Sequence, residues 1–194
     1  MDEIINQIKE SIIIRQKILN NSELLSKIEN SALMISNAYK SGFKTLIAGN
    51  GGSAADAQHM AGEFVSRFNF DRPGLPSLAL TTNTSVMTAI GNDYSYDKVF
   101  ARQIEAQGVH GDIFIGISTS GNSKNILEGI RKCIEKKIFI IGITGETGGE
   151  MAKLCNICIQ VPSQDTPRIQ EVHLFIEHTI CGIVEENLFR EYKK

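Results

Sequence analysis

The sequence predicts an α/β fold: one parallel sheet of about five strands flanked by helices, with two helices before the first strand and a long helix at the end. Two observations carry this prediction. Short apolar runs typical of buried strands alternate with helical patterns, and no change of composition marks a linker. We therefore expect one domain over residues 1–194, which is long enough for a sizeable core.

The composition is that of an ordinary globular protein, with 42% hydrophobic and 22% charged residues. A net charge of -2 gives no basic footprint for nucleic acid or for an anionic membrane surface. No apolar run is long enough to span a bilayer. Because the first residues are acidic and lack the basic flank of a signal peptide, we expect a cytoplasmic protein.

Residues 1–41 form an N-terminal helical extension in this interpretation. Its first helix has an apolar stripe at helical spacing, formed by Ile4, Ile5, Ile8 and Ile12. Ser22 is expected to cap the second helix, and Gly42 to end it. Two isoleucine-rich helices are more than one small sheet needs, so we expect this extension to pack against another subunit.

Strands are expected at 44–48, 75–80, 113–117, 137–143 and 156–161, and helices over 95–107, 124–136 and 167–191. Cys155 directly precedes the last predicted strand, and Cys158 lies within it. They form a single C-x-x-C with no second pair at zinc-ribbon spacing. Buried thiols are therefore the better interpretation than a redox or metal site.

The first chemical landmark is the turn Gly49–Ser53, which follows the first strand and opens a helix. Its glycines permit a tight turn. Ser53, as the expected N-cap, would leave amide groups and the positive helix end free for an anion. Asp56, His59 and Glu63 then share one helix face. Taken alone, this stretch is equally consistent with a solvated histidine–glutamate pair.

The second landmark is the loop Ser118–Ser123 after the third strand, where four hydroxyl side chains precede a helix. Hydroxyl and amide donors at a helix start can hold a phosphate monoester without lysine or arginine. Ligands of open α/β sheets also bind at the carboxyl ends of strands. A solvated turn is the alternative. No phosphate-loop motif is present, which argues against a nucleoside triphosphate.

These motifs, followed by Arg168–His173 and His178 in the last helix, resemble phosphoheptose isomerases of the sugar-isomerase (SIS) superfamily. The resemblance runs in order along essentially the whole chain. It implies a flavodoxin-like fold, a homotetramer with sites at subunit interfaces, and one zinc ion per subunit. The implied reaction converts D-sedoheptulose 7-phosphate to D-glycero-D-manno-heptose 7-phosphate, which feeds bacterial surface polysaccharide.

The resemblance also assigns residues. The implied zinc ligands are His59, Glu63, Gln170 and His178. The expected substrate contacts are Asn50, Gly51, Gly52, Ser53, Glu63, Asn92, Asp93, Ser118, Thr119, Ser120, Ser123 and Gln170. An isomerisation needs a base at carbon and a proton donor at oxygen, and Glu63 and His178 are the candidates for these two roles. The sequence assigns no role to Asp56, Arg67 or His173.

One geometric difficulty follows from the spacing of two implied ligands. On a continuous helix, Gln170 and His178 would be about 12 Å apart along the axis. We therefore expect a site shared between subunits, or a Gln170 that precedes the regular helix.

Two other functions are compatible with the loops. One is a regulatory or adaptor protein of the SIS fold that binds a phosphosugar or a replication initiator without catalysis. The other is an isomerase for a hexose or pentose phosphate. An adaptor has no need of the four implied zinc ligands, and the helix with Gln170 and His178 argues against the smaller sugars.

Overall fold

The computed structural model describes residues 1–193 and contains one five-stranded sheet, in the order β2-β1-β3-β4-β5, with every neighbouring pair parallel. The strands are β1 (Thr45–Ala48), β2 (Ser77–Ala79), β3 (Ile113–Ser118), β4 (Phe139–Thr144) and β5 (Ile157–Gln160). The predicted α/β class and parallel sheet are confirmed. The order is that of the flavodoxin-like fold, in which ligands bind where the strand order reverses.

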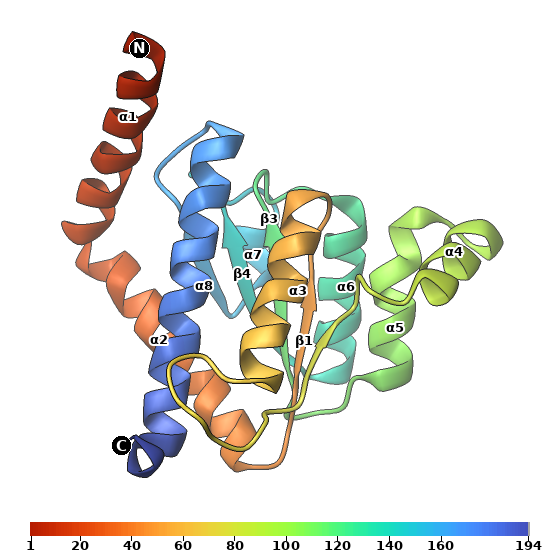
Figure 1. Cartoon of the computed structure of the whole chain (residues 1–194). Coiled ribbons are helices and arrows are strands. Elements are labelled where there is room, and N and C mark those ends of the chain that lie inside the picture. Colours follow the sequence, from red (N-terminus) through yellow and green to blue (C-terminus); the bar gives the residue numbers. More distant parts are fainter. Residues whose placement is uncertain (194) are drawn as a thin grey trace.

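Helices cover both faces of this sheet (Figure 1). They are α1 (Asp2–Leu19), α2 (Ser22–Lys40), α3 (Gly52–Val65), α4 (Thr84–Asp93), α5 (Val99–Gln107), α6 (Lys124–Lys136), α7 (Met151–Leu154) and α8 (Thr166–Phe189). Single 3-10 turns lie at Tyr96–Lys98 and Arg190–Tyr192. Helices α2, α3 and α8 pack on one face, and α5, α6 and α7 on the other. Helix α1 projects beyond the body of the molecule (Figure 1).

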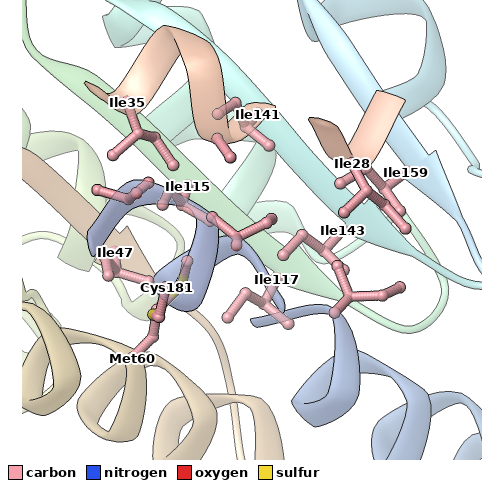
Figure 2. Packing of buried hydrophobic residues seen from close by; sticks show 14 of the residues in the cluster. Ile28, Ile35, Ile47, Met60, Ile115, Ile117, Ile141, Ile143, Ile159 and Cys181 are labelled. Carbon is pink, nitrogen blue, oxygen red and sulfur yellow. The ribbon is translucent and has the colours of Figure 1, made fainter. Parts of the chain in front are cut away.

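Each face of the sheet has its own apolar core. Ile115 and Ile117 of β3 point toward α2, α3 and α8 together with Ile141 and Ile143 of β4 (Figure 2). The alternate residues, such as Phe114, pack against α5 and α6. Burial on both faces explains why these strands are almost continuously apolar in sequence.

Several boundaries and caps differ from the predictions. Asn21, and not Ser22, caps α2, because its Oδ1 accepts the backbone N–H of Leu24 at 3.0 Å. Ser53 is not an N-cap: α3 begins one residue earlier, at Gly52, and Ser53 is buried inside its first turn. Gly51 takes the cap position with φ 56°, a conformation that favours glycine.

The predicted helix over 95–107 is divided into the 3-10 turn Tyr96–Lys98 and α5. The last helix is continuous from Thr166, so Gln170 lies within it and not before it. Cys155 precedes β5 and is half-buried, and burial raises its pKa to about 12. Among residues 1–193, no helix is long and apolar enough to cross a membrane.

Candidate functional site

The turn after β1 and the loop after β3 meet at the point where the strand order reverses. Strands β1 and β3 are neighbours, but α3 packs on one face of the sheet and α6 on the other. The side-chain amides of Asn50 and Asn125 bridge the two connections. Asn50 Nδ2 donates to Asn125 Oδ1 at 2.9 Å, and Asn125 Nδ2 donates to Asn50 Oδ1 at 2.8 Å. Two hydrogen bonds therefore join the two connections at the point where the strand order reverses.

Glycine is required in the turn because other groups approach its backbone closely. A Cβ on Gly49 would lie 2.2 Å from the carbonyl oxygen of Ser53. A Cβ on Gly52 would lie 2.5 Å from Nε2 of Gln170, so the Gln170 amide rests against the first residue of α3. The turn thus brings the start of α3 next to the first turns of α8.

The loop Ser118–Ser123 gathers hydroxyl groups ahead of α6. Ser118 Oγ is 2.9 Å from Ser123 Oγ and 3.5 Å from Ser120 Oγ. Ser118 is buried and Ser120 is exposed, so the cluster runs from the strand end to the surface. The first N–H groups of a helix have no intrahelical partner. Hydroxyl and amide donors therefore converge in a suitable seat for an anion.

Helices α3 and α8 lie side by side (Figure 1) and carry the second part of the site. Gly52 is next to Gln170, and His59 is next to His178, so the two helices run in the same direction. The Nε2 atoms of His59 and His178 are 2.7 Å apart, and His59 Nε2 is 3.3 Å from Glu63 Oε1. The His59 side chain is 43% exposed, which leaves the group open to solvent.

The donor set of His59, Glu63 and His178 fits a divalent cation. Their ligand atoms lie within 4.8 Å of one another, and within residues 1–193 this is the one such group of three. Zinc binds imidazole nitrogen and carboxylate oxygen at about 2.0–2.2 Å. One ion can therefore reach all three residues after small side-chain movements. We call these three residues the triad.

Comparison with known proteins identifies the family. The model of the SIS domain matches residues 13–145. "Phosphoheptose isomerase 2" of Campylobacter jejuni is 62% identical over 180 residues, covering 93% of this chain and 90% of that protein. The chain belongs to the phosphoheptose isomerase family of SIS-domain proteins.

Two further comparisons agree with this membership. Phosphoheptose isomerase of Aneurinibacillus thermoaerophilus is 60% identical over 189 residues, covering 97% of this chain and 96% of that protein. The solved structure of phosphoheptose isomerase from Neisseria gonorrhoeae is similar with a TM-score of 0.89 and 37% identity. It covers 95% of this chain and 98% of that one.

The structure brings together only some of the residues that the phosphoheptose isomerase resemblance assigns. Of the four implied zinc ligands, His59, Glu63 and His178 meet, whereas the Gln170 amide lies about two helical turns away at Gly52. Asn92 and Asp93 end α4 on the exposed surface, where Asn92 Nδ2 donates to Asp93 Oδ1 at 2.9 Å. In the described part of the chain, no hydrogen bond joins them to the two loops.

The three residues without an assigned role occupy different environments. Arg67 is exposed. Burial raises the pKa of Asp56, which is half-buried and whose Oδ2 lacks a hydrogen-bond partner within residues 1–193. His173 is fully buried, and burial lowers its pKa to about 4. Its Nε2 is 3.2 Å from the Thr144 carbonyl oxygen, an acceptor, so this nitrogen carries the hydrogen.

Sequence reasoning missed three residues at or beside the site. Asn125 and Tyr96 both hydrogen-bond to Asn50, the Tyr96 hydroxyl at 3.2 Å from Asn50 Oδ1. Asn125 could have been predicted, because Asn50 and Asn125 follow two strands that a parallel sheet can place together. No sequence pattern indicates Glu177. It is fully buried on α8, and burial, aided by the charge of Asp56, raises its pKa to about 8.

Proposed function

We propose that this protein interconverts D-sedoheptulose 7-phosphate and D-glycero-D-manno-heptose 7-phosphate, in the cytoplasm, for the activated heptose of a bacterial surface polysaccharide. One observation carries the proposal: the helix that starts at the bridged loops also carries His59 and Glu63. A phosphate seat and a group suited to proton transfer therefore belong to one continuous site. Family membership supports the same sugar-phosphate aldose–ketose isomerisation.

In this proposal the substrate phosphate binds the hydroxyl-rich loop and the turn after β1. Ser118, Thr119, Ser120 and Ser123 supply hydroxyl groups, and the start of α6 supplies free N–H groups. The other proposed contacts, Asn50, Gly51, Gly52, Ser53, Asn92, Asp93 and Gln170, surround the sugar chain. Hydroxyl and amide groups at a helix start bind phosphate mainly through fixed dipoles.

The reaction moves a proton between C1 and C2 and another between the two oxygens. We assign the carbon-bound proton to the Glu63 carboxylate and the oxygen-bound proton to the His178 imidazole. The 3.3 Å contact between His59 and Glu63 holds the carboxylate in place. The two catalytic side chains come from different helices, so they can approach neighbouring atoms of an extended sugar.

We propose Zn²⁺ as the cofactor, one ion per subunit, held by His59, Glu63, His178 and Gln170. The triad supplies two nitrogens and one oxygen, which suits zinc. When bound, the ion stabilises negative charge on the sugar oxygens as the carbonyl migrates. Because Gln170 and His178 are about 12 Å apart along α8, we propose that Gln170 completes the ligand set from a neighbouring subunit.

A homotetramer is proposed on the apolar surface of the N-terminal helices. On α1, Ile4, Ile8 and Ile12 are 60%, 55% and 49% exposed. Exposed apolar residues in one continuous stripe mark an interaction surface, and α1 extends away from its own sheet (Figure 1). Sedimentation of the protein at micromolar concentration tests this, and a monomer would contradict it.

The deciding experiment mixes the purified protein with sedoheptulose 7-phosphate and zinc and follows the sugar by NMR. We expect an aldoheptose 7-phosphate to appear, and we expect chelation of the metal to stop its formation. No conversion by an intact oligomer with zinc present would remove the heptose assignment. Conversion of a hexose or pentose phosphate instead would redirect the substrate, and conversion of none would favour the adaptor function.

A further inference from the structure

A buried ion pair lies where the connection between α3 and β2 crosses α8. The Arg72 side chain in this connection is 1% exposed, and that of Glu185 on α8 is 0% exposed. Arg72 Nε donates to Glu185 Oε1 at 3.1 Å. Figure 1 shows the connection in yellow, extending from the end of α3 toward α8. Burying two charges is costly unless their remaining hydrogen-bonding groups are satisfied, so the other partners of this pair indicate what it holds.

Arg72 holds the end of α3. Its Nη2 donates to the carbonyl oxygen of Glu63 at 2.8 Å, and its Nη1 donates to those of Phe64 at 2.7 Å and Ser66 at 3.0 Å. The last carbonyl groups of a helix have no intrahelical partner. One planar guanidinium therefore fixes the final turn of α3, including the backbone of the triad residue Glu63.

Glu185 holds the connection itself. Its Oε1 accepts the backbone N–H of Phe68 at 2.9 Å, and its Oε2 accepts that of Asn69 at 2.7 Å. The ring centroid of Phe68 lies 5.5 Å from that of His178. Glu185 is two helical turns from His178 on the same helix. The connection, seated on Glu185, therefore places an aromatic ring against a second triad residue.

We propose that Arg72 and Glu185 are positioning residues that set the placement of Glu63 on α3 relative to His178 on α8. They act through the Glu63 carbonyl group and the Phe68 ring, and not through the triad's ligand atoms. The proposal rests on the proposed function, which gives the triad a metal ion and two proton transfers. Lysine cannot replace Arg72 here, because its ammonium group lacks the planar fork that reaches several acceptors at once.

Two variants separate positioning from simple stabilisation. Arg72→Lys keeps the buried charge but loses the fork. The double variant Arg72→Met/Glu185→Leu removes both charges at similar volume, a replacement that often leaves a fold intact. Arg102→Lys is the matched control, because the Arg102 side chain is 44% exposed and lies over the Tyr94 ring.

Zinc affinity, measured by competition with a chromophoric chelator, is the first readout. Altered support of metal ligands weakens affinity about 10- to 100-fold, and we expect about tenfold for both Arg72 variants. We also expect kcat at saturating zinc to fall about tenfold while KM stays within about threefold. In metal-free protein, the ring NMR signals of His59 and His178 in the Arg72 variants should differ from those of the wild type. Folded variants with unchanged zinc affinity and ring signals would overturn the proposal.

If neither Arg72 variant folds, Phe68→Leu tests the positioning proposal. It retains the backbone bonds to Glu185 but removes the ring from His178. We expect zinc affinity to fall about threefold, less than the roughly 10- to 100-fold loss typical of altered ligand support because the backbone bonds remain, and we expect the His178 signals to shift. Wild-type affinity and signals would overturn the proposal. The ring signals report positioning without any turnover, so they test this proposal separately from the proposed function. Absence of isomerase activity in the wild type would contradict the proposed function only.

Discussion

The two halves of the candidate site are held in place by different parts of the fold. The loop half comprises the turn Gly49–Ser53 and the loop Ser118–Ser123, and its hydrogen bonds link residues close to two adjacent strand ends. The helix half is the triad, whose His59 and His178 are 119 positions apart in the chain and meet only because α3 packs on α8. The loop half is thus fixed by the sheet, whereas the helix half is fixed by the packing of two helices.

This difference predicts a division of labour: the loop half determines affinity for the phosphate, and the helix half determines turnover. Variants in one half should leave the kinetic parameter of the other half nearly unchanged. Three substitutions test that division and a fourth, in α8, tests the support of the helix half; they follow from the largest expected effect to the smallest.

Glu63→Gln should lower kcat about 10³-fold, because removal of a general base costs about 10²- to 10⁴-fold. KM should stay within about threefold, since the phosphate seat is untouched. Steady-state assays at saturating zinc check this and compensate for weaker metal binding. Glu135→Gln, an exposed position on α6, is the control. A Glu63→Gln enzyme with nearly normal kcat would remove Glu63 from the proton transfer and weaken the distinction between the halves.

The loop half could be located from the sequence because its signals are local. Apolar runs followed by glycine or hydroxyl clusters identify strand ends, and a parallel sheet places those ends on one edge. The predicted cap Ser22 was wrong because the neighbouring Asn21 side chain satisfies an N–H group at the start of α2. The predicted cap Ser53 was wrong because Gly51, with φ 56°, takes the cap position and α3 begins at Gly52 without a side-chain cap.

The helix half could be predicted only in part. The spacing of His59 and Glu63 places them on one helix face, but their meeting with His178 depends on the register of α3 against α8. That register is set by contacts without a sequence pattern, such as the Gln170 amide against Gly52 and the buried pair Arg72–Glu185. Spacing within one helix already separates Gln170 from His178, but only the register of α8 against α3 places the Gln170 amide next to Gly52.

His173→Gln tests how α8 is supported in acid. Burial lowers the pKa of His173 to about 4 from an ordinary 6.5, so the folded state binds this proton less well than the unfolded state. The associated stability is present above pH 6.5 and is lost as the pH falls toward 4. Between pH 6.5 and 4.5, the free energy of unfolding of the wild type should fall about 2–3 kcal/mol more than that of the variant.

Urea denaturation at the two pH values measures that difference, and His110→Gln is the control because His110 is exposed. Other titrating groups are common to both proteins, so they cancel in the comparison. An equal loss of stability in His173→Gln and wild type would show that burial does not lower the pKa of His173 in the folded protein.

Asn125→Ala should break the hydrogen-bonded bridge between Asn50 of the loop half and the start of α6. Asn125 is 4% exposed, and its loss leaves Asn50 Nδ2 without its partner, whereas Asn50 Oδ1 keeps the Tyr96 hydroxyl. An unsatisfied buried polar group costs about 1–3 kcal/mol, so we expect about 2 kcal/mol less stability in denaturant titrations. KM should rise severalfold with little change in kcat. Asn30→Ala on the exposed face of α2 is the control. A kcat that falls as much as KM rises would show that the two halves do not act independently.

Ser120→Ala should have the smallest effect on stability and the most selective effect on binding. Ser120 is exposed, so its replacement should change stability by less than about 0.5 kcal/mol. A hydrogen bond to a charged group contributes about 1.5–3 kcal/mol, and at this exposed position we expect about a tenfold rise in KM. Inorganic phosphate should also become about a tenfold weaker inhibitor, since the lost hydroxyl contacts the phosphate and not the sugar.

Inhibition by inorganic phosphate is the most informative measurement for Ser120→Ala, because it reports phosphate binding to the loop half independently of catalysis. Ser85→Ala, at an exposed position in the first turn of α4, should change neither constant. If KM rises while inhibition by phosphate stays the same, Ser120 contacts another part of the substrate. The phosphate would then lie deeper, near Ser118 and Ser123, whose hydroxyl groups are already 2.9 Å apart. The loop half would remain the anion seat, but its boundary would move toward the end of β3.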